Sequence, residues 1–287
     1  MIISIITATY NSSATVRDTL ESVLRQTYKN YEYVIVDGAS KDDTLNILRE
    51  YEPLFEGKMI IVSEPDRGLY DAMNKGISRT TGDVVGILNS DDFYSSDDAL
   101  QTIVDSFEND KNLGAVYGDV QYVKEDDTTK KVRYYSSKLF RRGLMRFGFM
   151  PAHPTFYCKR AIYEQFALDT TNIKEFKGST KKAYFNTNYK IAADFENLLR
   201  IIYIGQIKTQ YIQKNFVTMR IGGVSSSGIA SHKQINRDHL RALREHHIYS
   251  NVLFLGLRYI YKIGELVHGW ICNWISPIHE GRLTTKE

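Results

Sequence analysis

The sequence predicts an α/β protein with a mostly parallel sheet that is flanked by helices. Within the first 90 residues, short β-branched runs alternate with helical patterns, and the connections between them are short. Such repeats form right-handed crossovers and bury both faces of a sheet. The chain has 287 residues, of which 43% are hydrophobic and 25% charged. This composition is typical of a globular protein and excludes a disordered or collagen-like chain.

The strands and helices are expected in a regular order along the chain. The β-branched runs predict strands at residues 2–8, 31–37, 59–64 and 83–89. Apolar residues at helical spacing predict helices between these strands, at Val16, Leu20, Val23 and Leu24, at Leu45, Ile47 and Leu48, and at residues 69–79. Another helical pattern surrounds Asp194 and consists of Ile191, Phe195, Leu198, Leu199 and Ile202.

Polar residues follow each predicted strand, and four of them are Asp37, Asp66, Asp91 and Asp92. In open α/β sheets, ligands bind at the carboxyl ends of the strands. One such residue is explained by turn formation. Four carboxylates at one edge repel one another unless a cation or hydrogen-bond donors compensate, so we interpret this edge as a functional crevice.

Motifs that the chain lacks restrict the chemistry expected of this crevice. The chain has neither a GxxxxGK[ST] loop nor a GxGxxG motif, so a P-loop ATPase and a dinucleotide oxidoreductase are not supported. Its two cysteines, Cys158 and Cys272, form no CxxC pair, so no disulfide framework or thiolate zinc site is expected. Carboxylate oxygens favour Mg²⁺ or Mn²⁺, which commonly bridge to substrate phosphates.

The net charge of +3 conceals two halves of opposite sign. Residues 1–127 contain 11 Lys and Arg against 24 Asp and Glu, and residues 128–287 contain 26 against 10. An acidic half suits metal cations, whereas a basic half suits phosphates or an anionic membrane. Between Asp127 and Glu164, nine basic residues alternate with aromatic ones and no acid occurs. We expect no nucleic acid partner, because no binding module is visible, while a solvated basic face stays an alternative.

Several motifs resemble those of the family 2 glycosyltransferases, which are inverting, nucleotide-sugar-dependent enzymes of the GT-A fold. The resemblance covers about residues 1–230 and rests on ISIITATYN, VDGASKDDT, EPDRGLYDAMNKGISRTTGDVVGILNSDD and YKIAADFENLLR. It implies a Rossmann-like α/β sheet flanked by helices. It also implies a nucleoside-diphosphate sugar as co-substrate, with UDP as the default nucleotide, and a divalent cation, Mn²⁺ or Mg²⁺.

The resemblance also implies roles for individual residues. Asp194 resembles the base that activates the acceptor, and Asp91 and Asp92 resemble the metal ligands. The expected nucleotide-sugar site consists of Thr7, Thr9, Tyr10, Asn11, Asp37, Asp66, Arg67, Gly68, Lys75, Asn89 and Ser90. Candidates on the acceptor or diphosphate side are His153, Arg220, Gly222, Gly223 and Ser225.

Two positions differ from the usual family pattern. Asn89 stands where many members have the first Asp of the metal-binding motif, and Met73 stands where many have Arg. Metal binding would then depend on Asp91 and Asp92, and Arg67 or Lys75 would supply the missing cation.

We divide the chain into three regions by function. Residues 1–127 form the half that binds nucleotide sugar and metal, and residues 128–230 the acceptor half, with an insertion at 169–183. Residues 231–287 form C-terminal amphipathic helices. Charged residues interrupt the apolar stretch 251–275, which excludes a spanning helix and leaves an interfacial helix or a packed core or dimer helix.

The sequence therefore predicts an inverting transferase that moves a sugar to a hydroxyl of a glycolipid or polysaccharide. The alternatives are a catalytically silent nucleotide-sugar binding or scaffold protein and a sugar nucleotidyltransferase. No secretory signal is visible, so we expect a cytoplasmic protein, peripheral on the inner face of the cell membrane. No oligomeric state is predicted.

Overall fold

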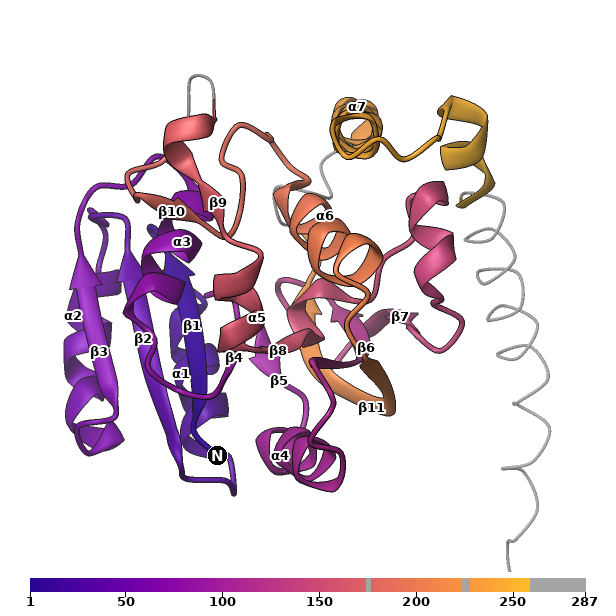
Figure 1. Cartoon of the computed structure of the whole chain (residues 1–287). Helices are drawn as coiled ribbons and strands as arrows, with labels where there is room; N and C mark the ends of the chain where they lie inside the picture. Colours follow the sequence, from indigo (N-terminus) through magenta and orange to yellow (C-terminus); the bar gives the residue numbers. More distant parts are fainter. Residues whose placement is uncertain (174–176, 223–227, 259–287) are drawn as a thin grey trace, which may run out of the picture.

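The computed structural model of the chain describes residues 1–173, 177–222 and 228–258 (Figure 1). Its strands are β1 (Ile3–Thr9), β2 (Tyr31–Asp37), β3 (Met59–Ser63), β4 (Val84–Ile87), β5 (Phe93–Tyr94), β6 (Ala115–Val123), β7 (Lys131–Tyr135), β8 (Tyr157–Lys159), β9 (Leu168–Asp169), β10 (Lys182–Ala183) and β11 (Thr209–Arg220). The four strands predicted for the first 90 residues are confirmed to within two residues at either end.

The helices follow the predicted alternation. The α-helices are α1 (Val16–Leu24), α2 (Thr44–Tyr51), α3 (Leu69–Arg79), α4 (Ala99–Asn109), α5 (Arg160–Gln165), α6 (Ala193–Leu198) and α7 (Gly228–Glu245). Short 3-10 helices are η1 (Glu52–Phe55), η2 (Arg142–Phe147), η3 (His153–Thr155) and η4 (Thr170–Asn172), and the π-helix η5 (Leu199–Ile204) continues α6. The three early helices and the helix around Asp194 are therefore confirmed.

One mixed sheet of nine strands joins both halves of the chain. Its order is β3-β2-β1-β4-β8-β6-β11-β5, and β7 pairs with β6. The first four strands are parallel, as predicted, whereas β8 is antiparallel to both of its neighbours. Strands β6 and β11 return to parallel pairing, so two parallel blocks meet at β8.

Two layers of helices cover the sheet. The helices α1, α2 and α4 pack on one face around the alternate β1 side chains Ile3 and Ile5, and α3, α5 and α6 cover the opposite face around Ile6 and Ala8. The helix α7 lies outside α6, away from the sheet (Figure 1). The period-2 alternation of the strands thus places half of each strand in each core layer.

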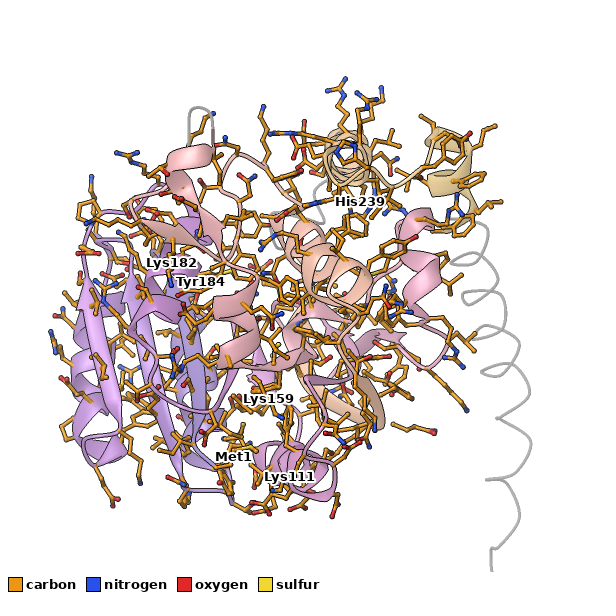
Figure 2. All side chains as sticks on the ribbon, viewed as in Figure 1. Met1, Lys111, Lys159, Lys182, Tyr184 and His239 are labelled. Carbon is orange, nitrogen blue, oxygen red and sulfur yellow. The ribbon has the colours of Figure 1, made fainter. Side chains whose placement is uncertain are left out.

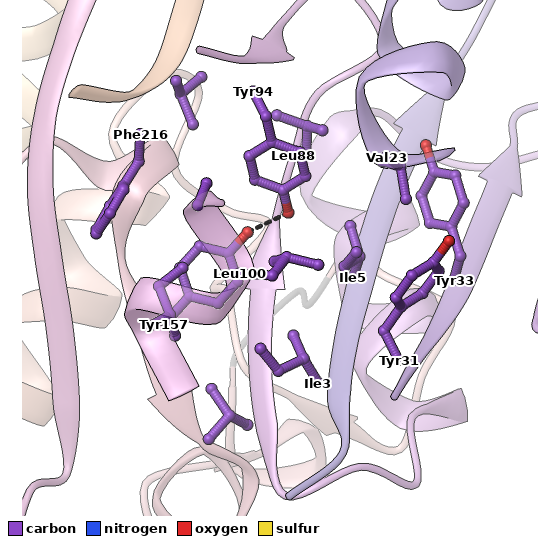
Figure 3. Packing of buried hydrophobic residues seen from close by; sticks show 14 of the residues in the cluster. Ile3, Ile5, Val23, Tyr31, Tyr33, Leu88, Tyr94, Leu100, Tyr157 and Phe216 are labelled. Carbon is purple, nitrogen blue, oxygen red and sulfur yellow. Dashed lines mark hydrogen bonds between the residues drawn. The ribbon is translucent and has the colours of Figure 1, made fainter. Parts of the chain in front are cut away.

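The core around β4 depends on a glycine at its centre. Figure 3 shows Tyr157 hydrogen-bonded to Tyr94 in this layer, and both rings are buried. A Cβ atom at Gly86 would lie 2.0 Å from the Cε1 atom of Tyr157. The absence of a side chain at Gly86 lets the Tyr157 ring lie directly against the strand.

We expect Gly86→Ala to lower the free energy of unfolding by about 1–3 kcal/mol, because the extra methyl group overpacks a rigid core. Chemical denaturation monitored by circular dichroism measures this change. Gly143→Ala is the matched control, since a Cβ atom there would meet no atom within 4 Å. An equal loss in both variants would show that contact with Tyr157 is not the cause.

Candidate functional site

The carboxyl ends of β1, β2 and β3 lie side by side. Thr9 pairs in register with Asp37, and Asp37 with Ser63, so the residues that follow each strand emerge at one edge. Strand β4 pairs in parallel with β1, which places the segment after it, residues 89–92, at the same edge. The carboxyl ends of the four predicted strands therefore lie along one edge of the sheet, as expected.

Asp37 is fully buried, and donors on neighbouring loops satisfy its carboxylate. The backbone N–H of Ser40 lies 3.1 and 3.3 Å from its two oxygens, and the Ser40 hydroxyl donates to it as well. The hydroxyl of Ser63 donates to it at 2.6 Å. Hydrogen-bond donors rather than a cation compensate this charge. At Asp37, compensation by donors is one of the two ways in which the expected repulsion among the four carboxylates is relieved.

The loops after β1 and β2 make a wall beside Asp66. Tyr10 is exposed, at 57% of its surface, and a Cβ atom at Gly38 would lie 2.5 Å from Asp66 Oδ2 and 3.3 Å from the Tyr10 ring. Asn11 adopts φ +50°, donates its backbone N–H to Ser40 Oγ at 2.8 Å and accepts a bond from the next loop. The bare backbone at Gly38 therefore allows these loops to approach closely.

Two predicted nucleotide-site residues lie deeper than the crevice surface. Thr7 is fully buried, and its hydroxyl donates to Leu88 O at 2.6 Å and lies 2.9 Å from Tyr33 OH. Its hydroxyl therefore joins β1 to the strand and loop beside it, and its place in the nucleotide site stays a prediction. Thr9 is also buried, but its hydroxyl has no hydrogen-bond partner among the described residues.

Hydroxyl groups near the start of α1 hold the segment 89–92. Ser90 Oγ lies 2.9 Å from Ser12 Oγ, Thr15 donates to the Ser90 carbonyl at 2.8 Å, and Thr19 donates to the Asp92 carbonyl at 2.7 Å. These bonds fix the backbone of the turn that carries both acids.

Burial makes the charges of the two acids in this turn costly, and Arg220 offsets part of that cost. Asp92 is fully buried; its Oδ1 and the Oδ1 of Asn89 have no hydrogen-bond partner there, while Asn89 Nδ2 donates to the other Asp92 oxygen at 3.3 Å. Burial raises the pKa of Asp92 well above its usual range, and the charge of Asp91 raises it further. Burial also raises the pKa of Asp91, although Arg220 opposes this.

This arrangement fits a divalent cation. Two adjacent carboxylates that are poorly solvated, one of them with an oxygen unpartnered among the described residues, are stabilised by positive charge. The described residues contain no group of three or more His, Cys, Asp or Glu that would enclose a metal. Mg²⁺ and Mn²⁺ suit such a site, because both prefer carboxylate and water oxygens as ligands. Mg²⁺ commonly binds one or two carboxylates and completes its shell with water and substrate phosphate.

Arg220 and Lys75, the basic residues expected near a diphosphate, both make contacts with neighbouring loops. Arg220 donates to the Asp91 carbonyl at 2.6 Å, pairs with Asp18 and lies 5.2 Å from the Phe93 ring. Lys75 donates to Pro65 O at 2.8 Å and lies 3.2 Å from a carboxylate oxygen of Glu64. The prediction that Lys75 replaces the missing arginine is therefore not supported by its contacts.

The loop after β3 and the start of α3 contact residues 177–179, which belong to the predicted insertion. Asp66 accepts the backbone N–H of Gly68 at 2.9 Å, and Gly68 adopts φ +110° just before α3. Arg67 reaches the carbonyls of Lys177 and Gly178, which lie in the 169–183 segment. That segment forms the hairpin β9–β10 and packs on the start of α3, where Ser179 donates to Asp71 at 2.7 Å through its backbone.

Asp194 lies in the first turn of α6, and its carboxylate faces His153. The His153 Nδ1 atom is 3.2 Å from Asp194 Oδ2, and the two side chains are 36% and 16% exposed. His153 comes from η3, 41 positions earlier in the chain. The structure thus brings the predicted base and a predicted acceptor-side residue into contact at a partly exposed position.

The remaining predicted residues follow β11. Gly222 is exposed and adopts φ +126°, and a Cβ atom there would lie 2.9 Å from a carboxylate oxygen of Glu125. Gly223 and Ser225 lie outside the described residues, as does the predicted interfacial helix beyond residue 258.

Sequence reasoning missed one residue that organises the site. Asn74, buried on α3, accepts the backbone N–H groups of Tyr184 and Phe185 at 2.9 and 2.8 Å and donates to the Phe185 carbonyl at 2.8 Å. It thereby attaches the segment before α6 to the donor half. The available signal was a polar residue on the buried face of α3, between Met73 and Ile77.

A mixed sheet with helices on both faces defines a fold of the GT-A class, which this chain shares with solved structures. The chain belongs to glycosyl transferase family 2, whose family model matches residues 4–170. It is therefore a glycosyltransferase. No helix within the described residues is long and apolar enough to cross a membrane.

Relatives and solved structures agree with this assignment. The chain is 37% identical over 225 residues to a PGL/p-HBAD biosynthesis glycosyltransferase of Mycobacterium tuberculosis. The matched region covers 78% of this chain and 79% of the relative. It is similar in fold to S. aureus TarS 1–349 in complex with UDP-GlcNAc, with a TM-score of 0.59, 19% identity, and coverage of 83% and 66%. It also resembles the mannosyltransferase PcManGT from Pyrobaculum calidifontis in complex with GDP-Man and Mn²⁺, with a TM-score of 0.54, 16% identity, and coverage of 92% and 80%.

Proposed function

We propose that this protein transfers a sugar from a nucleoside-diphosphate sugar to a hydroxyl of a glycolipid or polysaccharide acceptor, with inversion at the anomeric carbon. The observation that carries the proposal is the Asp194–His153 pair, which is separate in sequence from the two acids at residues 91 and 92. The pair suits activation of an acceptor, and the two acids suit a divalent cation that would neutralise a leaving diphosphate.

The donor nucleotide is assigned to the loops that follow β1, β2 and β3. Tyr10 offers an exposed aromatic face, Asn11 and Asp66 offer polar groups, and Asp37 orders the loop between them through Ser40. Thr9 has an unpartnered buried hydroxyl available to a ligand. UDP is the favoured nucleotide because the TarS complex contains UDP-GlcNAc, and the GDP-Man complex makes GDP the alternative.

A divalent cation would be held by Asp91 and Asp92, because burial makes both charges costly and one oxygen of Asp92 has no hydrogen-bond partner among the described residues. Such a cation, when bound, neutralises the diphosphate and makes it a better leaving group. Asn89 and Ser90 shape the turn, and Arg220 holds the Asp91 carbonyl in place. The chain's own residues thus prepare the turn before any ligand arrives.

Asp194 acts as the general base. It removes the proton from the acceptor hydroxyl while the hydroxyl oxygen forms a bond to the anomeric carbon. The bond between that carbon and the diphosphate oxygen breaks, and the nucleoside diphosphate leaves with the electron pair from the opposite face. His153 lies 3.2 Å from Asp194 and orients its carboxylate, so that one oxygen faces the acceptor.

A thermal-shift screen tests the proposed donor. UDP or a UDP-sugar should raise the melting temperature of the protein in the presence of Mn²⁺ more than in its absence, because a ligand that binds only the folded state stabilises it. GDP and its sugars are the comparison. If no nucleotide shifts the melting temperature with either metal, the assignment of these loops to a donor is wrong.

Turnover separates the enzyme from the alternative functions. Release of a nucleoside diphosphate from a nucleotide sugar, at a rate that depends on metal, supports the transferase. A silent binding or scaffold protein would show the thermal shift without turnover, and a nucleotidyltransferase would release inorganic diphosphate.

We assign the acceptor side to a membrane-facing surface made by η2 and residues 249–257. Phe147 of η2 stacks on Phe254 at 5.0 Å, and Arg146 lies 5.3 Å from the same ring. The apolar side chains exposed beside this basic helix are Tyr249, Val252, Leu253 and Leu257, with Leu253 80% exposed. Exposed apolar groups beside arginines suit the surface of an anionic membrane.

We expect Leu253→Asp to reduce binding to vesicles that contain anionic phospholipid by about tenfold. The substitution removes apolar area that would be buried in the membrane, and its carboxylate is repelled by the anionic lipid headgroups. Vesicle co-sedimentation measures this binding. Leu54→Asp is the matched control, since Leu54 is also exposed but belongs to η1. Equal binding by the wild type, Leu253→Asp and Leu54→Asp would contradict the assignment of this surface to a membrane.

A further inference from the structure

The peptide unit that precedes α6 is held from both sides. Tyr70, in the first turn of α3, donates its hydroxyl to the Ile191 carbonyl. On the other side, Asp238 of α7 accepts the backbone N–H of Ile191 at 3.0 Å and that of Ala192 at 3.3 Å. Asp194 follows these residues directly, so the chain that enters its helix is fixed between two other helices.

Asp238 is built for this contact. Its side chain is buried, with 4% of the residue exposed, and its second oxygen accepts a bond from Gln234 at 2.7 Å. A buried carboxylate that gives one oxygen to backbone N–H groups and the other to a side-chain amide is satisfied and rigid. The two backbone N–H groups that it accepts belong to Ala192, the N-cap residue of α6, and to the residue before it.

The helix α7 and His246, the residue directly after it, contact α6 at two further points. The His239 ring stacks on Phe195, with centroids 3.8 Å apart and 16° between the ring planes, and Figure 2 shows His239 between α7 and α6. His246 Nε2 lies 2.8 Å from the buried carboxylate of Glu196, which also pairs with Arg200. The two residues that follow Asp194 in α6, Phe195 and Glu196, are therefore held as well.

We propose that Tyr70 and Asp238 are positioning residues that set where the Asp194 carboxylate lies relative to the donor edge. Tyr70 belongs to the helix that begins at the Asp66–Gly68 loop, and Asp238 belongs to α7, so the pair relates the base to the donor half and to the C-terminal part of the chain. The inference rests on the proposed role of Asp194. A misplacement of about 1 Å costs on the order of 100-fold in rate, which makes such fixing significant.

The test compares kcat, the affinity for UDP and thermal stability in four variants, each assayed as the full chain. We expect Tyr70→Phe and Asp238→Ala to lower kcat by about tenfold or more, with the Kd for UDP in the presence of Mn²⁺ within about twofold of the wild-type value. Asp238→Asn should fall between Asp238→Ala and wild type, because the amide oxygen still accepts the backbone bonds.

The control is Asn236→Ala, on the same helix. Asn236 accepts a bond from Arg258 at 2.6 Å, so its removal weakens the contact of α7 with Arg258 and should leave kcat unchanged. A fall in kcat for Asn236→Ala equal to that of Asp238→Ala would show a general effect of α7 and overturn the proposal. If Asp238→Ala does not fold, Tyr70→Phe still decides, because it removes one oxygen and keeps the ring packing against Phe185.

The outcomes distinguish this inference from the proposed function. An inactive Asp194→Asn variant together with full kcat in Tyr70→Phe and Asp238→Ala overturns the positioning role and leaves the base assignment intact. An active Asp194→Asn variant overturns the base assignment, and the positioning role with it. A loss of UDP affinity that equals the loss of kcat would place the effect at the donor site and also overturn the inference.

Discussion

Replacing Asp194 with Asn is expected to lower the rate of sugar transfer by about 10²–10⁴-fold, because a general base contributes on this scale. The substitution keeps the shape of the side chain and its contact distance to His153, but removes the group that accepts the acceptor proton. Transfer is measured as nucleoside diphosphate released in the presence of acceptor. Binding of UDP with Mn²⁺, measured by thermal shift, should stay unchanged, since Asp194 lies outside the donor loops.

His153 supplies the comparison for this variant. If the imidazole only orients Asp194, His153→Gln should cost about tenfold, because the base remains and only its position relaxes. The opposite order, with His153→Gln much more harmful than Asp194→Asn, would make His153 the base and Asp194 its orienting partner. Full activity of Asp194→Asn would exclude either arrangement.

The sequence predicted the donor half well because its signals are local. The β-branched runs that became β1 to β4 carry strong periodicity, and parallel pairing follows from the crossover rule. Strand β8, with only three residues, has no such signal. Its antiparallel pairing with β4 and β6 depends on packing that no short window of sequence contains, so the mixed character of the sheet was not predicted.

The site shows the same division between local and distant information. The turn with Asp91 and Asp92 was located from the strand end before it. The contact between His153 and Asp194, however, joins residues 41 positions apart, and the bond between Asp238 and Ile191 joins residues 47 apart. Likewise, the sequence indicated that donors or a cation must compensate Asp37, but it did not identify Ser63, whose hydroxyl comes from a different strand. Charge and motif identify candidate residues, but only the fold shows which partners satisfy them.

Asp92→Asn is expected to change stability and activity in opposite directions. Asp92 is fully buried with one oxygen unpartnered among the described residues, so its charge is costly without a cation. Removing that charge should stabilise the metal-free protein by about 1–3 kcal/mol, the usual cost of a buried unsatisfied group. With Mn²⁺ and UDP the order should reverse, since only the wild-type protein gains the binding free energy of the complete site. Turnover should fall by at least about 100-fold.

The reversal is what distinguishes a metal ligand from a residue that merely weakens the fold. Thermal melts with EDTA and with Mn²⁺ plus UDP, run on wild type, Asp92→Asn and Asp91→Asn, measure it directly. Asp105→Asn is the charge control, because it removes the same charge from an exposed position on α4. If Asp92→Asn keeps the full Mn²⁺-dependent shift, Asp92 is not a ligand. Asp91 would then hold the cation alone, as the more accessible of the two acids at this turn.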